Sequence, residues 1–502
     1  MLPQFVISII AVLVVVAIAA FGFTTRGYFV HLALVFAPIL VFLVNSPSTW
    51  LILVLGLSKS GLVFPGLPQG LQVVHVLMAG LLGLLLARMS IEKGIAARRG
   101  LSDFFLLLFL AVIFMTAYVR GFGLRAMGGD TWGGMAYVKI LVTGGFLFLT
   151  RAMVLSERQF KKALFMMLGF ATLPALAQIV FLASGGKIYH QYMFIEAYVG
   201  TLLVALDATL GGGPVRYHML AGIANTVFMV GMILLAGRNF LSKAMIAFII
   251  LVTFVLTGMS GFRGQILYLL FMLVMIGTML GGRFNFRRLV AVGALALLAL
   301  LPLYLISSSL PAAMQRAISW LPGIDIRFDV RAEAMISTMS RMRIWEMAWM
   351  EVPRYLWIGK GFAVNPGDLM TMAARSDWAL NAFLSHNYHS GPLSLLLDTG
   401  VFGVLAGVLF MVFSTIEMIR RLPEVQDHPL LQRAFIFFLA QHIYAVISYY
   451  VIFGDVRESF PAMFINLTIM HMLLNSARDS DRRARLALDQ AAAAPKVPIL
   501  KP

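Results

Sequence analysis

Residues 389–403 read HSGPLSLLLDTGVFG, and this stretch changes from polar to apolar within five residues. A long polar stretch precedes it, and Pro392 suits the first turn of a helix, where a backbone N–H would have no partner. The stretch therefore predicts the start of an apolar helix with the titratable ring of His389 at its mouth. Apolar helices of this kind recur along the chain, and they decide the fold class.

The composition is that of a membrane protein. Of the 502 residues, 60% are hydrophobic and 12% are charged, which is about half the charged fraction of a soluble protein. The apolar runs are long enough to cross a bilayer, at about 20 residues each. We predict an all-α polytopic membrane protein with about 14 transmembrane helices. Their predicted centres are Val14, Pro38, Leu55, Leu81, Ala111, Val142, Leu173, Val227, Ile250, Leu270, Leu297, Val404, Leu439 and Leu467.

The net charge of +17 points to orientation in the bilayer and not to nucleic acid. Most Lys and Arg side chains lie in short loops between apolar runs, and with this count of spans those loops share one face. The positive-inside rule makes that face cytoplasmic and predicts both termini there. The chain has no cysteine, which excludes disulfides and thiolate metal sites.

One long segment stands out on the opposite face. Residues 307–391 form a large loop before the third-last span, with several expected helices, one of them from Arg341 to Pro353. Its Trp and Met side chains are expected to rest on the membrane interface. A loop of this length is functional by default. The predicted organisation is one polytopic domain, 1–475, containing this loop, followed by a disordered cytoplasmic tail, 476–502.

His389 is the first candidate for chemistry. The positive end of the predicted helix disfavours an imidazolium, so the ring stays neutral and can act as a general base. The alternative is a histidine that only caps a loop. His386 and Asn387, a few residues upstream in SHNYH, are candidates for a helper or a substrate contact.

Arginines on the same face form a second group of candidates. Arg263 lies in a short loop between two apolar runs, and Arg216 lies at the entry to a span. Their guanidinium groups can bind phosphate oxygens in a bidentate manner, although both can instead be interfacial anchors. Three further arginines on this face are weaker candidates for substrate contacts, since each can be a loop charge or part of an ion pair: Arg120, Arg125 and Arg457. No metal-ligand spacing or nucleotide-binding loop occurs, so no metal and no cofactor is expected.

With these residues, the chain resembles the O-antigen ligase and polysaccharide polymerase superfamily of bacterial membrane glycosyltransferases. Residues 389–403 are similar to that family's H-[NSQ]-x9-G-x-x-G signature, with the spacing counted from His389. Residues 256–265, LTGMSGFRGQ, look like its Thr-Ser-Arg-Gly segment, with extra residues before the arginine. Residues 343–362 look like the stretch before the catalytic loop, and residues 215–226 are a looser match.

The resemblance implies an inverting, metal-independent transfer of a saccharide at the periplasmic face of the bacterial inner membrane. It implies an undecaprenyl-diphosphate-linked donor, a glycan or lipid acceptor, and other polysaccharide-assembly proteins as possible partners. His389 would deprotonate the acceptor, and Arg216 and Arg263 would hold the diphosphate. His386 and Asn387 also resemble the pair that heads the signature, so the choice of base between the two histidines stays open.

Three alternatives remain open at this stage. The superfamily contains both ligases and repeat-unit polymerases, and no residue type here separates them. A transporter or lipid flippase would instead need ionisable residues near the span centres and repeat symmetry between halves. A non-catalytic scaffold of an assembly complex would make His389 dispensable.

Overall fold

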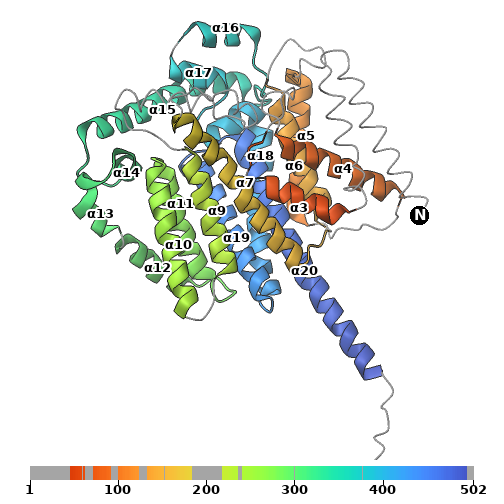
Figure 1. The fold of residues 1–502 in the computed structure, drawn as a ribbon. Coiled ribbons are helices and arrows are strands. Elements are labelled where there is room, and N and C mark those ends of the chain that lie inside the picture. The colour runs from red at the N-terminus through yellow and green to blue at the C-terminus, as the bar shows by residue number, and fades with distance from the viewer. Residues whose placement is uncertain are drawn as a thin grey trace, which may run out of the picture.

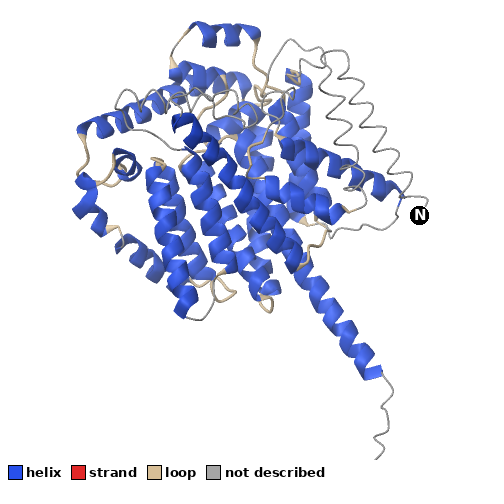
Figure 2. Cartoon of the chain, in the orientation of Figure 1, coloured by secondary structure: helices blue, strands red, loops and turns tan. Residues whose placement is uncertain are grey.

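The computed structural model describes residues 46–58, 60–62, 72–91, 100–123, 133–151, 153–183, 218–235, 240–298, 300–375 and 377–493. Within these ranges the chain is helical and forms no strand (Figure 2), which confirms the all-α class. The helices are α3 Pro47–Leu57, α4 Val73–Ile91, α5 Leu101–Arg120, α6 Met135–Thr150, α7 Glu157–Ala183, α9 His218–Leu234, α10 Phe240–Met259, α11 Arg263–Met279, α12 Phe286–Leu298, α13 Leu301–Ile306, η3 Ser307–Ser309, α14 Ala312–Ile318, α15 Phe328–Tyr355, α16 Pro366–Ala374, α17 Trp378–Leu384, α18 Gly391–Arg421, η4 Leu422–Val425, α19 Pro429–Val451 and α20 Val456–Ala493.

The predicted spans coincide with helices wherever the structure describes them. All predicted centres except Val14 and Pro38, which lie outside the described residues, fall inside a helix. In the described part of the chain, 6 helical stretches are long and apolar enough to cross a bilayer. They are Leu101–Arg120, Leu241–Met259, Phe286–Ser309, Gly391–Val425, Pro429–Val451 and Val456–Gln490. The protein is therefore a polytopic helical membrane protein, and the total of 14 stays a prediction.

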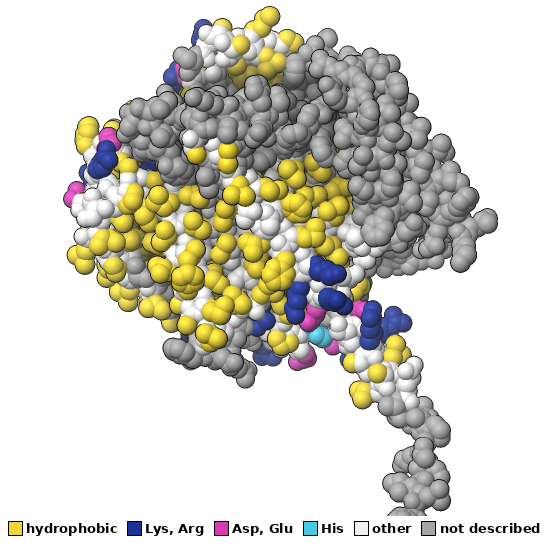
Figure 3. Space-filling model, in the orientation of Figure 1, with side chains coloured by type: hydrophobic (Ala, Val, Ile, Leu, Met, Phe, Trp, Pro, Cys, Tyr) yellow, Lys and Arg dark blue, Asp and Glu magenta, His cyan; other side chains and the backbone are white. Residues whose placement is uncertain are grey.

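Helices α18, α19 and α20 lie in the middle of the bundle (Figure 1). Helix α18 packs along α5, and α20 packs against α19 and α6. Stacked aromatic rings join these helices, with the ring centroids of Phe109 and Phe460 4.4 Å apart. Peripheral helices keep apolar side chains on the outside, since α12 has no buried residue. A broad apolar surface results (Figure 3), as expected where lipid replaces water.

The long loop before α18 is helical and lies at one end of the bundle. Helices α15, α16 and α17 lie at that end, and the C-terminal part of α20 projects from the other end (Figure 1). The predicted start of a helix at Arg341 is wrong, because α15 begins at Phe328. No proline or glycine lies between Gly323 and Pro353, so nothing interrupts the helix before its last turn.

Helix α20 passes the predicted end of the membrane domain at residue 475 without a break. It continues to Ala493, and residues 480–490 are exposed and mostly polar. An ion pair one turn apart, Arg483 Nη2 to Asp479 Oδ2 at 2.7 Å, supports this part of the helix. Within the predicted tail, only residues 494–502 lie outside the described residues.

Candidate active site

Helix α18 is interrupted two and a half turns after its start. Gly400 has φ 71° and ψ −178°, so the regular pattern of hydrogen bonds stops there. A non-helical segment, residues 356–361, lies beside the interruption and supplies the missing partners. The bonds are Lys360 N to Leu397 O at 2.6 Å, Gly361 N to Asp398 O at 3.1 Å, and Val401 N to Leu356 O at 2.8 Å. The membrane helix therefore breaks without leaving these backbone groups unpaired.

Glycine is required on both sides of this contact. A Cβ atom on Gly400 would lie 2.3 Å from the carbonyl oxygen of Trp357, and its positive φ disfavours any other residue. A Cβ atom on Gly359 would lie 2.3 Å from the backbone carbon of Asp398. The structure thus explains why the first residue of the G-x-x-G pattern, Gly400, is a glycine: it lets residues 356–361 approach α18 closely.

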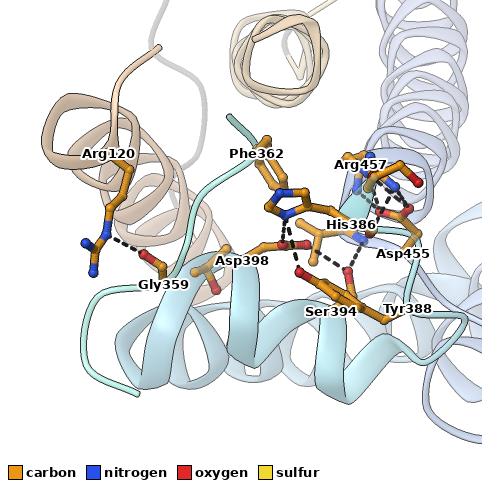
Figure 4. Close-up of polar contacts among 12 residues, drawn as sticks. Arg120, Gly359, Phe362, His386, Tyr388, Ser394, Asp398, Asp455 and Arg457 are labelled. Atoms are coloured by element: carbon orange, nitrogen blue, oxygen red, sulfur yellow. Dashed lines mark hydrogen bonds and ion pairs between the residues drawn. The ribbon is translucent and has the colours of Figure 1, made fainter. Parts of the chain in front are cut away.

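Arg120, at the end of α5, holds the same segment from its other side (Figure 4). Its Nε donates to the carbonyl oxygen of Gly359 at 2.9 Å, and its Nη2 donates to that of Ile358 at 3.0 Å. Arg120 thus anchors residues 356–361 against α5. Its predicted contact with substrate stays a prediction.

His386 precedes the start of α18 and lies in a fully buried polar cluster. Its Nδ1 is 3.0 Å from Oδ1 of Asp398, and Ser394 donates to Oδ2 of Asp398 at 3.0 Å. The hydroxyl of Tyr388 lies 3.3 Å from the same Nδ1 (Figure 4). Burial, together with the charges of Lys360 and Arg457, lowers the pKa of His386 to about 3. His386 is therefore neutral at physiological pH and closed off from solvent.

Arg457, from the start of α20, holds the turn that contains both histidines. Its Nη1 donates to the carbonyl oxygen of Ser385 at 2.7 Å, and its Nη2 donates to that of His386 at 3.0 Å. The carboxylate of Asp455 accepts from Nη2 at 2.6 Å and from Nε at 3.1 Å. This engagement favours a positioning role for Arg457, and its predicted contact with substrate is untested.

His389 is the partly exposed member of the pair. Its ring lies between two aromatic side chains, with centroids 5.3 Å from Trp378 and 5.1 Å from Phe453. Burial, together with the charge of Arg341, lowers its pKa to about 4 against the opposing effect of Asp455. Neither ring nitrogen has a hydrogen-bond partner among the residues that the structure describes. The imidazole is thus neutral and free to accept a proton.

Several buried polar atoms without partners belong to residues 381–389. Within the described residues, the side-chain oxygens of Asn381 and Asn387 and Nε2 of His386 lack a hydrogen-bond partner, as both nitrogens of His389 do. Unpaired buried polar groups are uncommon, and each needs an explanation such as a catalytic role or a bound molecule. Their concentration between residues 381 and 389 marks this region as the candidate active site.

Helix α15 contacts both Arg263 and the turn that contains His389. Nη2 of Arg263 lies 3.5 Å from the carbonyl oxygen of Ala334, and Nε1 of Trp345 donates to the carbonyl oxygen of Tyr388 at 3.0 Å. Steps of 7 and 11 residues return to the same face of a helix, so Ala334, Arg341 and Trp345 share one face. At about 1.5 Å per residue, the contact with Arg263 lies about 10 Å along the helix from Arg341.

Arg341 is the site residue that the sequence analysis missed. It lies on this face between the Arg263 contact and the His389 turn, and its charge acts on His389. One signal was available, since Arg341 stands four residues before Trp345 in a stretch already expected to be helical. Arg216 and Arg125 lie outside the described residues. In the described part of the chain, no group of three His, Cys, Asp or Glu side chains could hold a metal ion.

A comparison with known families supports the resemblance. Residues 245–408 match the family described as O-Antigen ligase. This match supports membership of the O-antigen ligase superfamily. The matched part runs from α10 into α18 and contains Arg263, Arg341, the two histidines and Gly400. The match also supports a glycan-transferring membrane enzyme of the ligase and polymerase type. No curated protein matches the chain.

Proposed function

We propose that this protein is an inverting, metal-independent glycosyltransferase that moves a saccharide from an undecaprenyl-diphosphate-linked donor to a glycan or lipid acceptor, in cell-surface polysaccharide biosynthesis. The observation that carries the proposal is His389, which is neutral, partly exposed and without a hydrogen-bond partner among the described residues. It lies at the start of a membrane helix, where an amphipathic lipid-linked donor and a polar acceptor can meet.

His389 would act as the general base. A ring nitrogen takes the proton of an acceptor hydroxyl as the oxygen attacks the anomeric carbon of the donor sugar. The bond between that carbon and the diphosphate oxygen breaks in the same step, and the electron pair leaves with the diphosphate. One displacement of this kind inverts the configuration at the anomeric carbon.

Arginines would stabilise the negative charge that develops on the leaving diphosphate. Arg263 and Arg341 reach the same face of α15 about two turns apart, so a diphosphate near this face can meet more than one guanidinium group. We include Arg216 on the strength of the resemblance. Charge neutralisation by guanidinium groups would make a metal ion unnecessary in this step.

Two alanine substitutions test the proposal. In cells that lack the gene, His389→Ala and Arg263→Ala should each abolish surface glycan transfer while the protein accumulates in the membrane. The matched controls are His428→Ala and Arg287→Ala, because His428 pairs with Asp481 near the C-terminal helix and Arg287 is exposed on α12. Wild-type transfer in both test variants would overturn the assignment.

We also propose that the enzyme spans the inner membrane about 14 times, with both termini in the cytoplasm and the catalytic loop, residues 307–391, in the periplasm. The opposite placement of the α15–α17 end and the C-terminal part of α20 supports this orientation (Figure 1). A cytoplasm-active reporter fused after residue 502 should be active, and one inserted at the exposed Met370 in α16 should be inactive. The reverse pattern would exclude this topology.

A further inference from the structure

Trp378 is a half-exposed aromatic residue in direct contact with the proposed base. It is the first residue of α17, and its indole ring packs against the ring of His389 with centroids 5.3 Å apart and an angle of 29°. Rings stacked without offset would lie closer, so the two rings are displaced sideways and part of the indole face is uncovered. The side chain is 51% exposed.

Contacts of the neighbouring Asp377, and not His389, fix the position of α17 and of its first residue, Trp378. Asp377 caps α17, and its carboxylate accepts from the backbone N–H groups of Ala379 at 3.0 Å and Leu380 at 3.2 Å. The same carboxylate pairs with Nη2 of Arg343 in α15 at 2.9 Å. A short helix that is capped and joined to α15 in this way holds the exposed ring beside the active site at little cost in side-chain entropy.

Polar groups without partners occur on α17 and in the turn that follows it. Asn381 lies three residues after Trp378, so the two side chains are neighbours on α17. Its Oδ1, the Oδ1 of Asn387 and both ring nitrogens of His389 have no hydrogen-bond partner within the described chain. The two amide oxygens accept hydrogen bonds, and so does one of the two nitrogens of a neutral imidazole. The region therefore favours a ligand that brings hydroxyl donors.

We propose that Trp378 forms the subsite for the acceptor sugar ring. A pyranose presents one face of C–H bonds, whose slightly positive hydrogens suit the negative face of an indole. Its hydroxyls point outward from the ring edge, where one can donate to His389. The subsite would place the attacking hydroxyl at the base, and it rests on the proposed glycosyl transfer.

The subsite predicts a selective kinetic effect. Trp378→Ala should raise the KM for acceptor about tenfold, as expected for the loss of one aromatic stacking contact, and leave the KM for lipid-linked donor within about twofold. Trp378→Tyr should retain most of the acceptor affinity because it keeps an aromatic face. Trp349→Ala is the matched control, since Trp349 is also an exposed tryptophan of this loop, at 59%, on α15.

The assay uses the purified full-length enzyme, with donor and acceptor extracted from a strain that lacks the gene. Each variant is first compared with the wild type by its elution as a single species in detergent. Trp378→Leu, which keeps an apolar side chain without an aromatic face, takes the place of the alanine variant if that variant does not fold. An acceptor KM in the folded alanine or leucine variant that stays at the value of Trp349→Ala, or a rise confined to the donor KM, would overturn the subsite.

A separate variant distinguishes this result from failure of the proposed function. If His389→Ala and Arg263→Ala both still transfer glycan at the wild-type rate, the proposed function itself is wrong. If His389→Ala is inactive and Trp378→Ala has wild-type kinetics, the function stands and only the acceptor subsite is rejected.

Discussion

Nδ1 of His386 lies 3.0 Å from Oδ1 of Asp398, and both side chains are fully buried. His386 precedes α18, and Asp398 follows two turns inside it, just before the break at Gly400. The contact therefore ties the turn that holds His389 to the interrupted part of the membrane helix. Changes at either residue should affect stability as well as transfer.

Loss of the Asp398 carboxylate should be strongly destabilising. Asp398→Ala removes the buried carboxylate that accepts from the hydroxyl of Ser394 and lies 3.0 Å from Nδ1 of His386. At about 1–3 kcal/mol for each unpaired group, we expect a loss of about 3 kcal/mol in the free energy of unfolding. Thermal unfolding in detergent measures the effect.

The control for Asp398 is Asp427→Ala, which changes an exposed carboxylate between η4 and α19. Its melting temperature should stay close to that of the wild type. Equal melting temperatures for the two variants would show that the buried cluster does not stabilise the fold.

Gly400 should not tolerate alanine. Its φ of 71° is unfavourable for alanine, and the added Cβ atom would lie 2.3 Å from the carbonyl oxygen of Trp357. We expect a loss of about 2 kcal/mol or more in stability, together with a lower transfer rate, because the 356–361 segment must move away. Gly293→Ala is the control, since its added Cβ would meet nothing within 4 Å in α12. Similar unfolding curves for both variants would contradict the proposed close approach.

The pH dependence of transfer should show an acid limb near pH 4. Burial lowers the pKa of His389 to about 4, so the ring can accept a proton at all higher pH values and loses that ability as pH falls through 4. We expect a constant initial rate from pH 8 to about 5, where over nine-tenths of the base is neutral. An acid limb near pH 6.5, the ordinary histidine value, would show a solvated base and contradict the structure.

Stability should fall over a related acid window. The pKa values of His386 and His389 are lowered to about 3 and about 4 in the folded protein, against 6.5 for ordinary histidine. Between these values the unfolded chain binds more protons, so these two rings favour unfolding increasingly as pH falls below 6.5. Unfolding measured in parallel separates this effect from the loss of the base, and His386→Gln should weaken the pH dependence of unfolding. An unchanged dependence in that variant would exclude His386 as its source.

Arg457→Lys should impair transfer by disturbing the histidine turn. Lysine lacks the planar fork that lets Arg457 contact Ser385, His386 and Asp455 together. Both histidines of the turn have positive φ, 61° and 53°, and such conformations persist only when their surroundings hold them. We expect a fall of about tenfold in kcat with little change in either KM.

A change in donor KM alone would instead support the direct substrate contact that the sequence predicted for Arg457. Arg420→Ala, which removes an exposed charge at the end of α18, serves as the control and should leave both constants unchanged.

The sequence by itself determined the membrane class and the position of most described helices, and it named His389 and His386 as the candidate bases. These depend on local properties, namely the length of apolar runs, the proline that starts α18 and the spacing from His389 to Gly400. Helix α15 begins earlier than the sequence predicts, at Phe328, because no proline or glycine interrupts it before Pro353. Each of these signals lies within one continuous segment of the chain, so it can be found without knowing how the segments pack.

Only the tertiary structure decided how the segments combine. Asp398 became the partner of His386, Arg120 an anchor for the 356–361 segment, and Arg341 a neighbour of His389. The physical reason is that these contacts join residues separated by up to 239 positions along the chain, so no local spacing contains them. Each depends on how α5, α15, α18 and α20 pack, and that packing turns a histidine at a helix mouth into a candidate base with its supports.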